Sequence, residues 1–281
     1  MVKICKEYFP ESEGFYMDGY MKSNLDIAKK VIKKDWDMLF VYDGGEGSGK
    51  SVKAMQDAFY CDPTLTNKRI VFTPEQFKKV IMKAKPYQAV VYDEAYTGLS
   101  SRATMSMINR TLISMLAEIR QKNLFVFVVM PCFFDLDKYV TLWRSRALIH
   151  VYTSKNFKRG YFSFYNVDRK KELFVLGKKY YSYSKPKPNF IGRFTNFYTV
   201  DEKEYRKHKR NSLVAREEID ERKKIFVRLF QFDGKLTTYE KAKLLGMTQP
   251  TYCNWSRQYK KGMLEGIPSE MAFNKTTKQI S

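Results

Sequence analysis

One run of eight residues constrains the fold of this 281-residue chain more than any other feature. Residues 44–51 read GGEGSGKS, which fits the spacing G-x-x-x-x-G-K-[ST]. Glycines let the backbone wrap tightly, so that several N–H groups point inward and hold phosphates. Lys50 is expected to reach the β- and γ-phosphates of a nucleoside triphosphate, and the Ser51 hydroxyl to bind Mg²⁺. The predicted phosphate contacts are Gly44, Gly45, Glu46, Gly47, Ser48, Gly49, Lys50 and Ser51.

The segments on either side of this run have the character that the chemistry requires. Residues 36–42 are mostly apolar and predict a short buried strand, and a helix is expected from Lys50 to about Tyr60. A helix that starts at the loop adds the positive end of its dipole to the phosphate site. A glycine-rich turn without a ligand is the plain alternative, and the strand–loop–helix context argues against it. We therefore predict a P-loop that binds ATP with Mg²⁺.

An acidic pair follows another apolar segment and supplies the second half of such a site. Residues 88–92 predict a strand that places Asp93 at its carboxyl end, where its carboxylate can hold Mg²⁺. The adjacent Glu94 is expected to polarise the attacking water. A glutamate in that place favours hydrolysis over phosphate transfer to a metabolite, because a kinase must keep water away from the γ-phosphate. The sequence therefore predicts an ATPase.

A hydrolase of this kind also needs positive charge at the γ-phosphate in the transition state. Arg144 and Arg146 precede a predicted strand, and either is a candidate arginine finger that reaches a neighbouring subunit. Surface arginines or partners in a structural ion pair are the alternative for both. Further candidates are Arg102, Arg110 and Arg120.

The rest of the amino-terminal half alternates between short apolar runs and amphipathic segments. This pattern predicts an α/β fold, with a mostly parallel sheet and helices on both faces. The predicted strands are residues 36–42, 69–72, 88–92, 124–130 and 147–152, and the predicted helices cover residues 25–34, 50–60 and 105–122, with one more starting at Thr73.

The pattern changes after about residue 153. Residues 161–165 and 173–176 flank a charged turn and predict a β-hairpin, residues 182–188 an extended linker, and residues 206–228 a charged helix. The predicted organisation is an ATPase core (1–153), a basic extension of hairpin, linker and helix (154–228), a small helical module (229–265) and a mobile tail (266–281).

The helical module has the signature of a helix-turn-helix. Thr237 and Glu240 have the spacing of a capping box, and Gly246 sits where the turn needs a positive φ. A helical hairpin that docks on protein is the alternative to DNA contact. The candidate groove contacts on the second helix are Gln249, Thr251, Asn254, Arg257 and Gln258.

The charge balance points to a polyanionic partner. The chain carries 51 Lys and Arg against 30 Asp and Glu, a formal net charge of +21. Such an excess favours nucleic acid, here double-stranded DNA, over generic solubility charge. The aromatic-rich residues 152–198 are a weaker candidate surface for stacking bases.

Cysteine usage and hydropathy indicate the cellular compartment of the protein. Four isolated cysteines and two histidines form no zinc motif, which indicates reduced thiols. The longest apolar run, residues 124–130, is too short to span a bilayer, and the polar amino terminus does not read as a signal peptide. We expect a cytoplasmic protein, in the host cytoplasm if it is viral.

These motifs together resemble the FtsK/HerA superfamily of P-loop ATPases. The likeness covers roughly residues 36–152 and is closest to zonula-occludens-toxin-like and viral DNA-packaging or mobile-element ATPases. It implies a ring, usually hexameric, that pumps DNA or drives virion assembly, with a capsid or portal protein as a possible partner. It also implies phosphate and Mg²⁺ on Lys50, Ser51 and Asp93, water on Glu94, and an arginine from 144–146 acting in trans. The fourth strand ends at Val129-Met130 without the polar residue of that family.

Three hypotheses remain open at this point. The first is an ATP-driven DNA translocase or packaging motor of a virus or mobile element. The second is an ATP-switched DNA-binding protein, such as a replication initiator or transposition regulator of the AAA+ kind. The third is a basic nucleotide kinase that ignores DNA.

Overall fold

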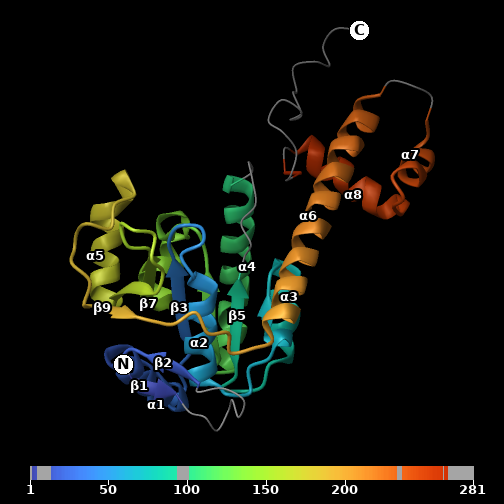
Figure 1. The fold of residues 1–281 in the computed structure, drawn as a ribbon. Coiled ribbons are helices and arrows are strands. Elements are labelled where there is room, and N and C mark those ends of the chain that lie inside the picture. The colour runs from blue at the N-terminus through green and yellow to red at the C-terminus, as the bar shows by residue number, and fades with distance from the viewer. Residues whose placement is uncertain (1, 5–13, 94–100, 233–235, 262, 265–281) are drawn as a thin grey trace. The chain divides into compact units, whose positions relative to one another are not determined.

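The structure is a computed structural model that describes residues 2–4, 14–93, 101–232, 236–261 and 263–264 (Figure 1). These residues form two compact units, and the boundary between the units within the long helix α6 (Glu202–Gln231) falls between Lys209 and Arg210. The first unit holds the sheet and the glycine-rich loop of residues 44–49, and the second is helical. Each unit is described by itself.

The first unit is built on a seven-stranded sheet. Its strand order is β4-β5-β6-β3-β7-β8-β9, and a separate two-stranded sheet pairs β1 (Val2–Ile4) with β2 (Phe15–Met17). The four pairings among β3 to β7 are parallel, whereas β8 and β9 add to the edge in antiparallel fashion. The predicted mostly parallel α/β sheet is therefore confirmed. Its strands are β3 (Met38–Asp43), β4 (Ile70–Val71), β5 (Ala89–Asp93), β6 (Phe125–Val129), β7 (Ser145–Tyr152), β8 (Tyr161–Tyr165) and β9 (Phe190–Arg193).

The register of the central strands brings two distant segments to the same edge. Val129 at the end of β6 pairs with Tyr42 of β3 on one side and with Asp93 of β5 on the other. Neighbouring parallel strands lie about 4.8 Å apart, so the ends of β3 and β5 are roughly 10 Å from each other. The loop after β3 and the Asp93 carboxylate therefore share the carboxyl edge of the sheet, where open α/β sheets bind ligands.

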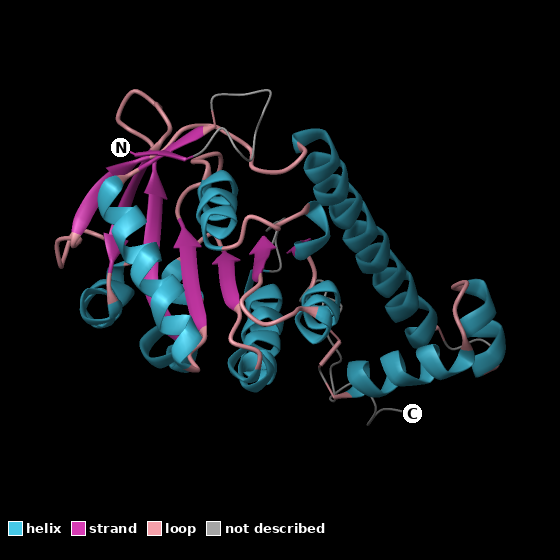
Figure 2. Ribbon diagram, turned by 90° about the horizontal axis from the view of Figure 1, so that it is seen from below, coloured by secondary structure: helices cyan, strands magenta, loops and turns pink. Residues whose placement is uncertain are grey.

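Helices cover both faces of this sheet (Figure 2). Phe125 and Phe127 of β6 pack into one core with α1 (Gly19–Val31) and α2 (Lys50–Cys61). Val126 and Val128 pack into the opposite core with α3 (Pro74–Lys83), α4 (Ser101–Gln121) and α5 (Val167–Gly177). Burial on both faces explains why β6 is a continuous apolar run. Short helical turns complete the unit: η2 (Ile32–Lys34), η3 (Asn67–Arg69), η4 (Phe133–Asp135), η5 (Val140–Arg144) and η6 (Lys178–Tyr180).

The first helix starts earlier than its sequence suggests. α1 begins at Gly19, six residues before the predicted start, and Asp18 Oδ1 accepts from the Met21 N–H at 3.1 Å. Ser23 and Asn24 directly precede the predicted start, and their side chains donate to the carbonyls one turn back, Ser23 to Gly19 and Asn24 to Tyr20. The prediction failed because serine and asparagine satisfy backbone groups inside a helix as well as at its start.

The predicted hairpin of residues 161–165 and 173–176 is wrong in its second strand. Residues 173–176 lie in α5, which Asn166 caps by accepting from the Arg169 N–H at 3.0 Å. Leu173 and Phe174 are buried in the core of the sheet face, and Val175 is exposed. The apolar residues 173–176 resembled a strand because the rest of the helix, including its cap Asn166, is mostly polar. β8 instead pairs with β7 and with β9.

The second unit is a small helical assembly. Its core joins Phe226 and Val227 of α6 to residues of α7 (Thr238–Leu244) and α8 (Gln249–Lys260). The predicted capping box is present, with Thr237 N donating to Glu240 Oε2 at 2.7 Å, and Gly246 has a φ of 60° in the turn. The predicted mobile tail, residues 266–281, lies outside the described residues.

Candidate phosphate-binding site

The loop after β3 has a conformation that depends on glycine. Gly44, Gly47 and Gly49 have φ angles of 137°, 70° and 98°, in the region where other residues are strained. A Cβ on Gly44 would lie 1.8 Å from the carbonyl oxygen of Val151 in β7, so no side chain fits there. The strand that neighbours β3 therefore fixes where the loop leaves the sheet.

Lys50 curls back over this loop. Its Nζ donates to the carbonyl oxygens of Gly44 at 2.7 Å and Gly45 at 2.8 Å. Burial lowers the pKa of Lys50, and the nearby carboxylates of Asp43 and Asp93 oppose that shift. The hydrogen-bond acceptors of this ammonium among the described residues are thus neutral carbonyls, which a phosphate oxygen outcompetes as a partner.

The start of α2 offers uncapped backbone donors to the same place. Gly49 is the N-cap residue, and no side chain caps this helix. The first-turn N–H groups of a helix have no intrahelical partner and carry the positive end of its dipole. Ser48, the preceding residue, is 2 % exposed, and its Oγ has no hydrogen-bond partner among the described residues. An unpaired buried hydroxyl costs about 1–3 kcal/mol, which a bound acceptor would recover.

Asp93 and Ser51 both lie beside residues from the start of α6. The Tyr205 hydroxyl donates to Asp93 Oδ2 at 2.5 Å, and the Ser51 side chain lies close enough to lower the pKa of Tyr205 by hydrogen bonding. Burial and the Asp93 charge more than offset this and raise that pKa well above its usual value. Lys209 Nζ lies 3.0 Å from the same carboxylate oxygen. The two predicted Mg²⁺ ligands are therefore brought together, with a tyrosine and a lysine at the junction.

A third cation approaches the loop from the connection between β7 and β8. A Cβ built on Gly47 would lie 3.5 Å from Arg159 Nη2. Phe194 covers the other side, because a Cβ on Gly49 would lie 3.1 Å from its ring. Lys50, Lys209 and Arg159 thus approach the loop from three segments, an arrangement suited to a polyphosphate. The sequence motif identified only the first of these cations.

Asp43, the last residue of β3, anchors the base of the loop. Its Oδ1 lies 2.9 Å from His150 Nδ1 of β7, and its Oδ2 accepts from the Phe133 N–H at 3.0 Å and from the Tyr183 hydroxyl. The Tyr183 ring stacks on His150 with centroids 3.9 Å apart. Residues 182–188, predicted as a plain linker, therefore contribute a structural contact directly beneath the loop.

Residues 194–200 form an irregular segment, the strap, that runs along α2 and leads into α6 at the site. Gln56 Nε2 of α2 donates to the carbonyls of Thr195 at 2.7 Å and Phe197 at 2.9 Å, and Thr199 Oγ1 donates to Met55 O at 3.2 Å. The strap thus crosses α2, the helix that follows the glycine-rich loop, just before α6 begins. No local sequence signal indicates this path, because its partners lie about 140 residues away.

The candidate finger arginines lie at the opposite edge of the sheet. Arg144 Nη2 pairs with Asp37 at 2.6 Å, and Arg146 lies 4.6 Å from the centre of the Trp36 ring. Both precede or begin β7, whereas the glycine-rich loop follows β3, so the length of a strand, roughly 20 Å, separates them from this loop in the same chain. An in-trans role stays a prediction.

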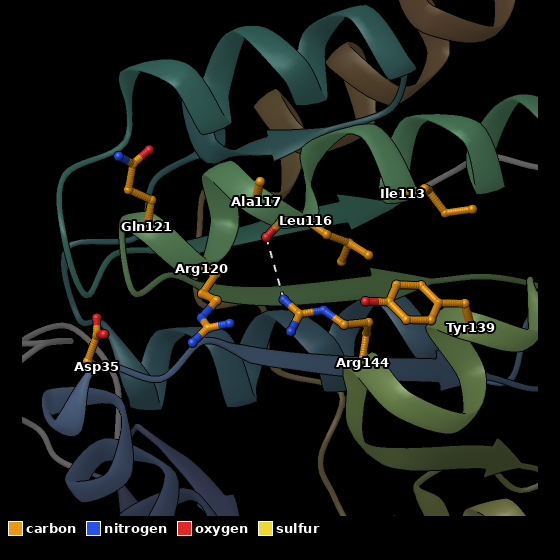
Figure 3. A pocket seen from close by; sticks show the side chains of 8 residues that line it. All are labelled: Asp35, Ile113, Leu116, Ala117, Arg120, Gln121, Tyr139 and Arg144. Carbon is orange, nitrogen blue, oxygen red and sulfur yellow. Dashed lines mark hydrogen bonds between the residues drawn. The ribbon is translucent and has the colours of Figure 1, made fainter.

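An open groove of about 600 Å³ lies beside Arg144 at this edge (Figure 3). Arg120 of α4 and Tyr139 line it, and Arg144 donates to Leu116 O at 3.5 Å. Arg110 is exposed on α4, and the side chain of Arg102 lies outside the described part of the chain. Glu94, the predicted water-polarising residue, also lies outside it.

The residues predicted to contact DNA share one helix of the second unit. Trp255 packs against Phe226 with ring centroids 5.6 Å apart, which fixes the inward face of α8. The candidate contacts Gln249, Thr251, Asn254 and Arg257 are exposed, and Gln258 is half-buried.

The chain was compared with family models and with curated proteins. No family model matches the chain, and no curated protein matches it. Among the described helices, none is both long and apolar enough to cross a bilayer.

Proposed function

We propose that the chain is a magnesium-dependent ATPase that acts on double-stranded DNA as a translocase or packaging motor of a virus or mobile element. The observation that carries the proposal is the convergence of Lys50, Ser51 and Asp93 at one edge of a parallel sheet. A loop with three positive φ angles and an uncapped helix start lies between them. These residues fit a triphosphate with its metal ion, and the unpaired Ser48 hydroxyl offers a further polar contact.

Each residue has one role in the proposed reaction. Lys50 and the first turn of α2 bind the phosphates, while Ser51 and Asp93 hold Mg²⁺. The bound ion neutralises charge on the β- and γ-phosphates. Glu94 orients the attacking water, and an arginine from a neighbouring subunit, Arg144 or Arg146, stabilises the transition state. The ring that this arginine requires is part of the proposal.

The DNA part of the proposal rests on charge and on α8. The net charge of +21 favours a polyanion, and four of the five candidate contacts on α8 are exposed. α7 and α8, with Gly246 in the turn, act in this proposal as a helix-turn-helix. A capsid or portal protein would be the further partner of a packaging motor, and the cytoplasm of the host the site of action.

An ATP-controlled DNA-binding switch is the second candidate. The observation in its favour is that one helix, α6, carries both partners of Asp93 and continues into the unit that contains α8. A switch of this kind hydrolyses ATP slowly and binds DNA tightly with sequence preference. The nucleotide kinase remains the alternative without DNA.

The deciding experiment measures ATPase rate against added double-stranded DNA, with the molecular mass of the assembly determined by light scattering. The motor predicts a ring whose hydrolysis is cooperative and stimulated by DNA of any sequence. Slow hydrolysis with selective DNA binding would favour the switch. A monomer that ignores DNA would contradict both.

A further inference from the structure

The junction of α6 with the phosphate site holds a lysine that the proposed reaction does not yet use. Lys209 Nζ lies 3.0 Å from Asp93 Oδ2 and 3.3 Å from the Tyr205 hydroxyl. The Asp93 side chain is 3 % exposed, whereas that of Lys209 is 31 % exposed. The ammonium therefore neutralises a buried carboxylate from the solvent side.

The same carboxylate is the proposed magnesium ligand, so the two cations compete for it. A divalent ion takes hard oxygen ligands, and Asp93 with Ser51 supplies two of them. Both are engaged by α6 here, Asp93 by Lys209 and Tyr205, and Ser51 by proximity to Tyr205. Magnesium at Asp93 would place two cations on one carboxylate group unless Lys209 moves.

A displaced Lys209 would need a new anionic partner. Lys209 is one of the charges that act on Lys50 at the loop, so the two ammonium groups lie near enough for their charges to interact. A triphosphate bound there would bring its terminal phosphate between them, and lysine is a flexible point charge suited to following such a group.

We propose that Lys209 exchanges partners during the nucleotide cycle, leaving Asp93 to magnesium and pairing with the terminal phosphate of the bound triphosphate. Tyr205 stays beside Ser51 and holds the first turn of α6 at the site. Lys209 is then a residue that distinguishes ATP from ADP, acting within its own chain. This inference rests on the proposed nucleotide function and specifies how the same site reports the γ-phosphate.

The test is a binding measurement on the full chain. Calorimetry gives the dissociation constants of Mg-ATPγS and Mg-ADP, and a magnesium titration at fixed ATPγS gives the half-saturating concentration of the metal. Lys209→Met is compared with Lys207→Met, which removes the same charge from an exposed position on the same turn of α6.

The proposal predicts two shifts in Lys209→Met, a weaker preference for the triphosphate and tighter binding of magnesium. The preference for ATPγS over ADP falls about tenfold, because one charge-assisted contact to the γ-phosphate is lost. The half-saturating magnesium concentration falls at least about threefold, because Asp93 has lost its internal cation. Lys207→Met leaves both quantities at their wild-type values.

A second variant separates the tyrosine from the lysine. Tyr205→Phe keeps the ring that packs on Phe72 and Tyr198 but removes the hydroxyl that binds Asp93. It lowers the magnesium requirement and keeps the preference for ATPγS, because Lys209 is still present.

The outcomes separate this inference from the proposed function. Equal values for Lys209→Met and Lys207→Met, in a chain that binds Mg-ATPγS through Lys50, overturn the partner exchange and leave the nucleotide site intact. Failure of the wild-type chain to bind either nucleotide overturns the proposed function itself.

Discussion

Lys209 lies 3.0 Å from Asp93 although 116 residues separate them in the chain. Asp93 ends β5 at the carboxyl edge of the sheet, and Lys209 stands on the second turn of α6. The strap over α2 brings the two together. The candidate magnesium site is therefore assembled from distant segments of the first unit, and α6 continues beyond Lys209 into the second unit.

The close approach of Gly44 to β7 predicts a stability effect that is independent of any ligand. Gly44→Ala should lower the free energy of unfolding by about 3 kcal/mol or more, because its Cβ would collide with Val151 O at a φ of 137°. Gly45→Ala is the matched control, since nothing lies within 4 Å of a Cβ there, and should change stability by less than about 0.5 kcal/mol. Urea unfolding measures both; equal stability of the two variants would show that the loop path is different.

Arg159 is predicted to contribute to nucleotide affinity. Arg159→Ala should weaken Mg-ATPγS binding about five- to tenfold, because the guanidinium lies beside Gly47 and would form charge-assisted hydrogen bonds to a bound phosphate. Lys155→Ala removes a charge from an exposed position of the same connection and should have little effect. Calorimetric titration distinguishes them. If both variants lose affinity equally, Arg159 contributes only general positive charge.

We predict that burial of Lys170 makes the free energy of unfolding depend on pH. It is fully buried in α5, donates to the Thr141 carbonyl, and burial lowers its pKa to about 7. Between about pH 7 and pH 10 the unfolded chain binds a proton at this lysine that the folded chain does not, so this group makes stability rise with pH. Below pH 7 the penalty for the buried charge is complete.

Replacing this lysine should therefore stabilise the chain most at low pH. Lys170→Met should gain about 1–3 kcal/mol of unfolding free energy at pH 6 and clearly less at pH 9.5. Lys179→Met, at an exposed position nearby, should show no such trend. Urea unfolding at the two pH values tests this. A gain that is the same at both would mean that Lys170 does not titrate between them.

α8 is predicted to contact DNA through its exposed face. Arg257→Ala should weaken binding to double-stranded DNA by about 1–3 kcal/mol if it reads a base, or mainly reduce the salt dependence if it contacts phosphate. Such a point variant is preferable to deletion of residues 229–281, which would strip the packing from Phe226 and Val227. Lys179→Ala, in the first unit, is the charge control. Unchanged binding by Arg257→Ala in a fluorescence anisotropy titration would favour a protein-docking module.

The sequence predicted the parts of this fold that depend on neighbouring residues. β3, the loop and α2 follow from local composition, and Thr73 caps α3 as its spacing indicates, accepting from the Gln76 N–H at 3.2 Å. The capping box at Thr237 is equally local. In each case the residues that determine the conformation lie within a few positions of one another.

The parts that sequence reasoning missed depend on distant contacts. Tyr205 acts at the site through Asp93, 112 residues earlier, and nothing in the charged start of α6 distinguishes it from a solvent-exposed helix. Lys170 is buried although lysine usually marks a surface, so the inward face of α5 was hidden and a strand was predicted. The ion pair of Arg144 is of the same kind, because its partner, Asp37, precedes it by 107 residues.

The most direct test of the central claim is the affinity of the chain for Mg-ATP measured by calorimetry, with Lys50→Ala beside the wild type. Lys30→Ala, exposed on α1, serves as the charge control. We expect one nucleotide per chain with a dissociation constant on the order of micromolar, a loss of at least about a hundredfold in Lys50→Ala, and no change in Lys30→Ala. Binding of equal strength by the wild type and Lys50→Ala, or no binding by the wild type at millimolar nucleotide, would contradict the assignment of residues 44–51 as a nucleotide site.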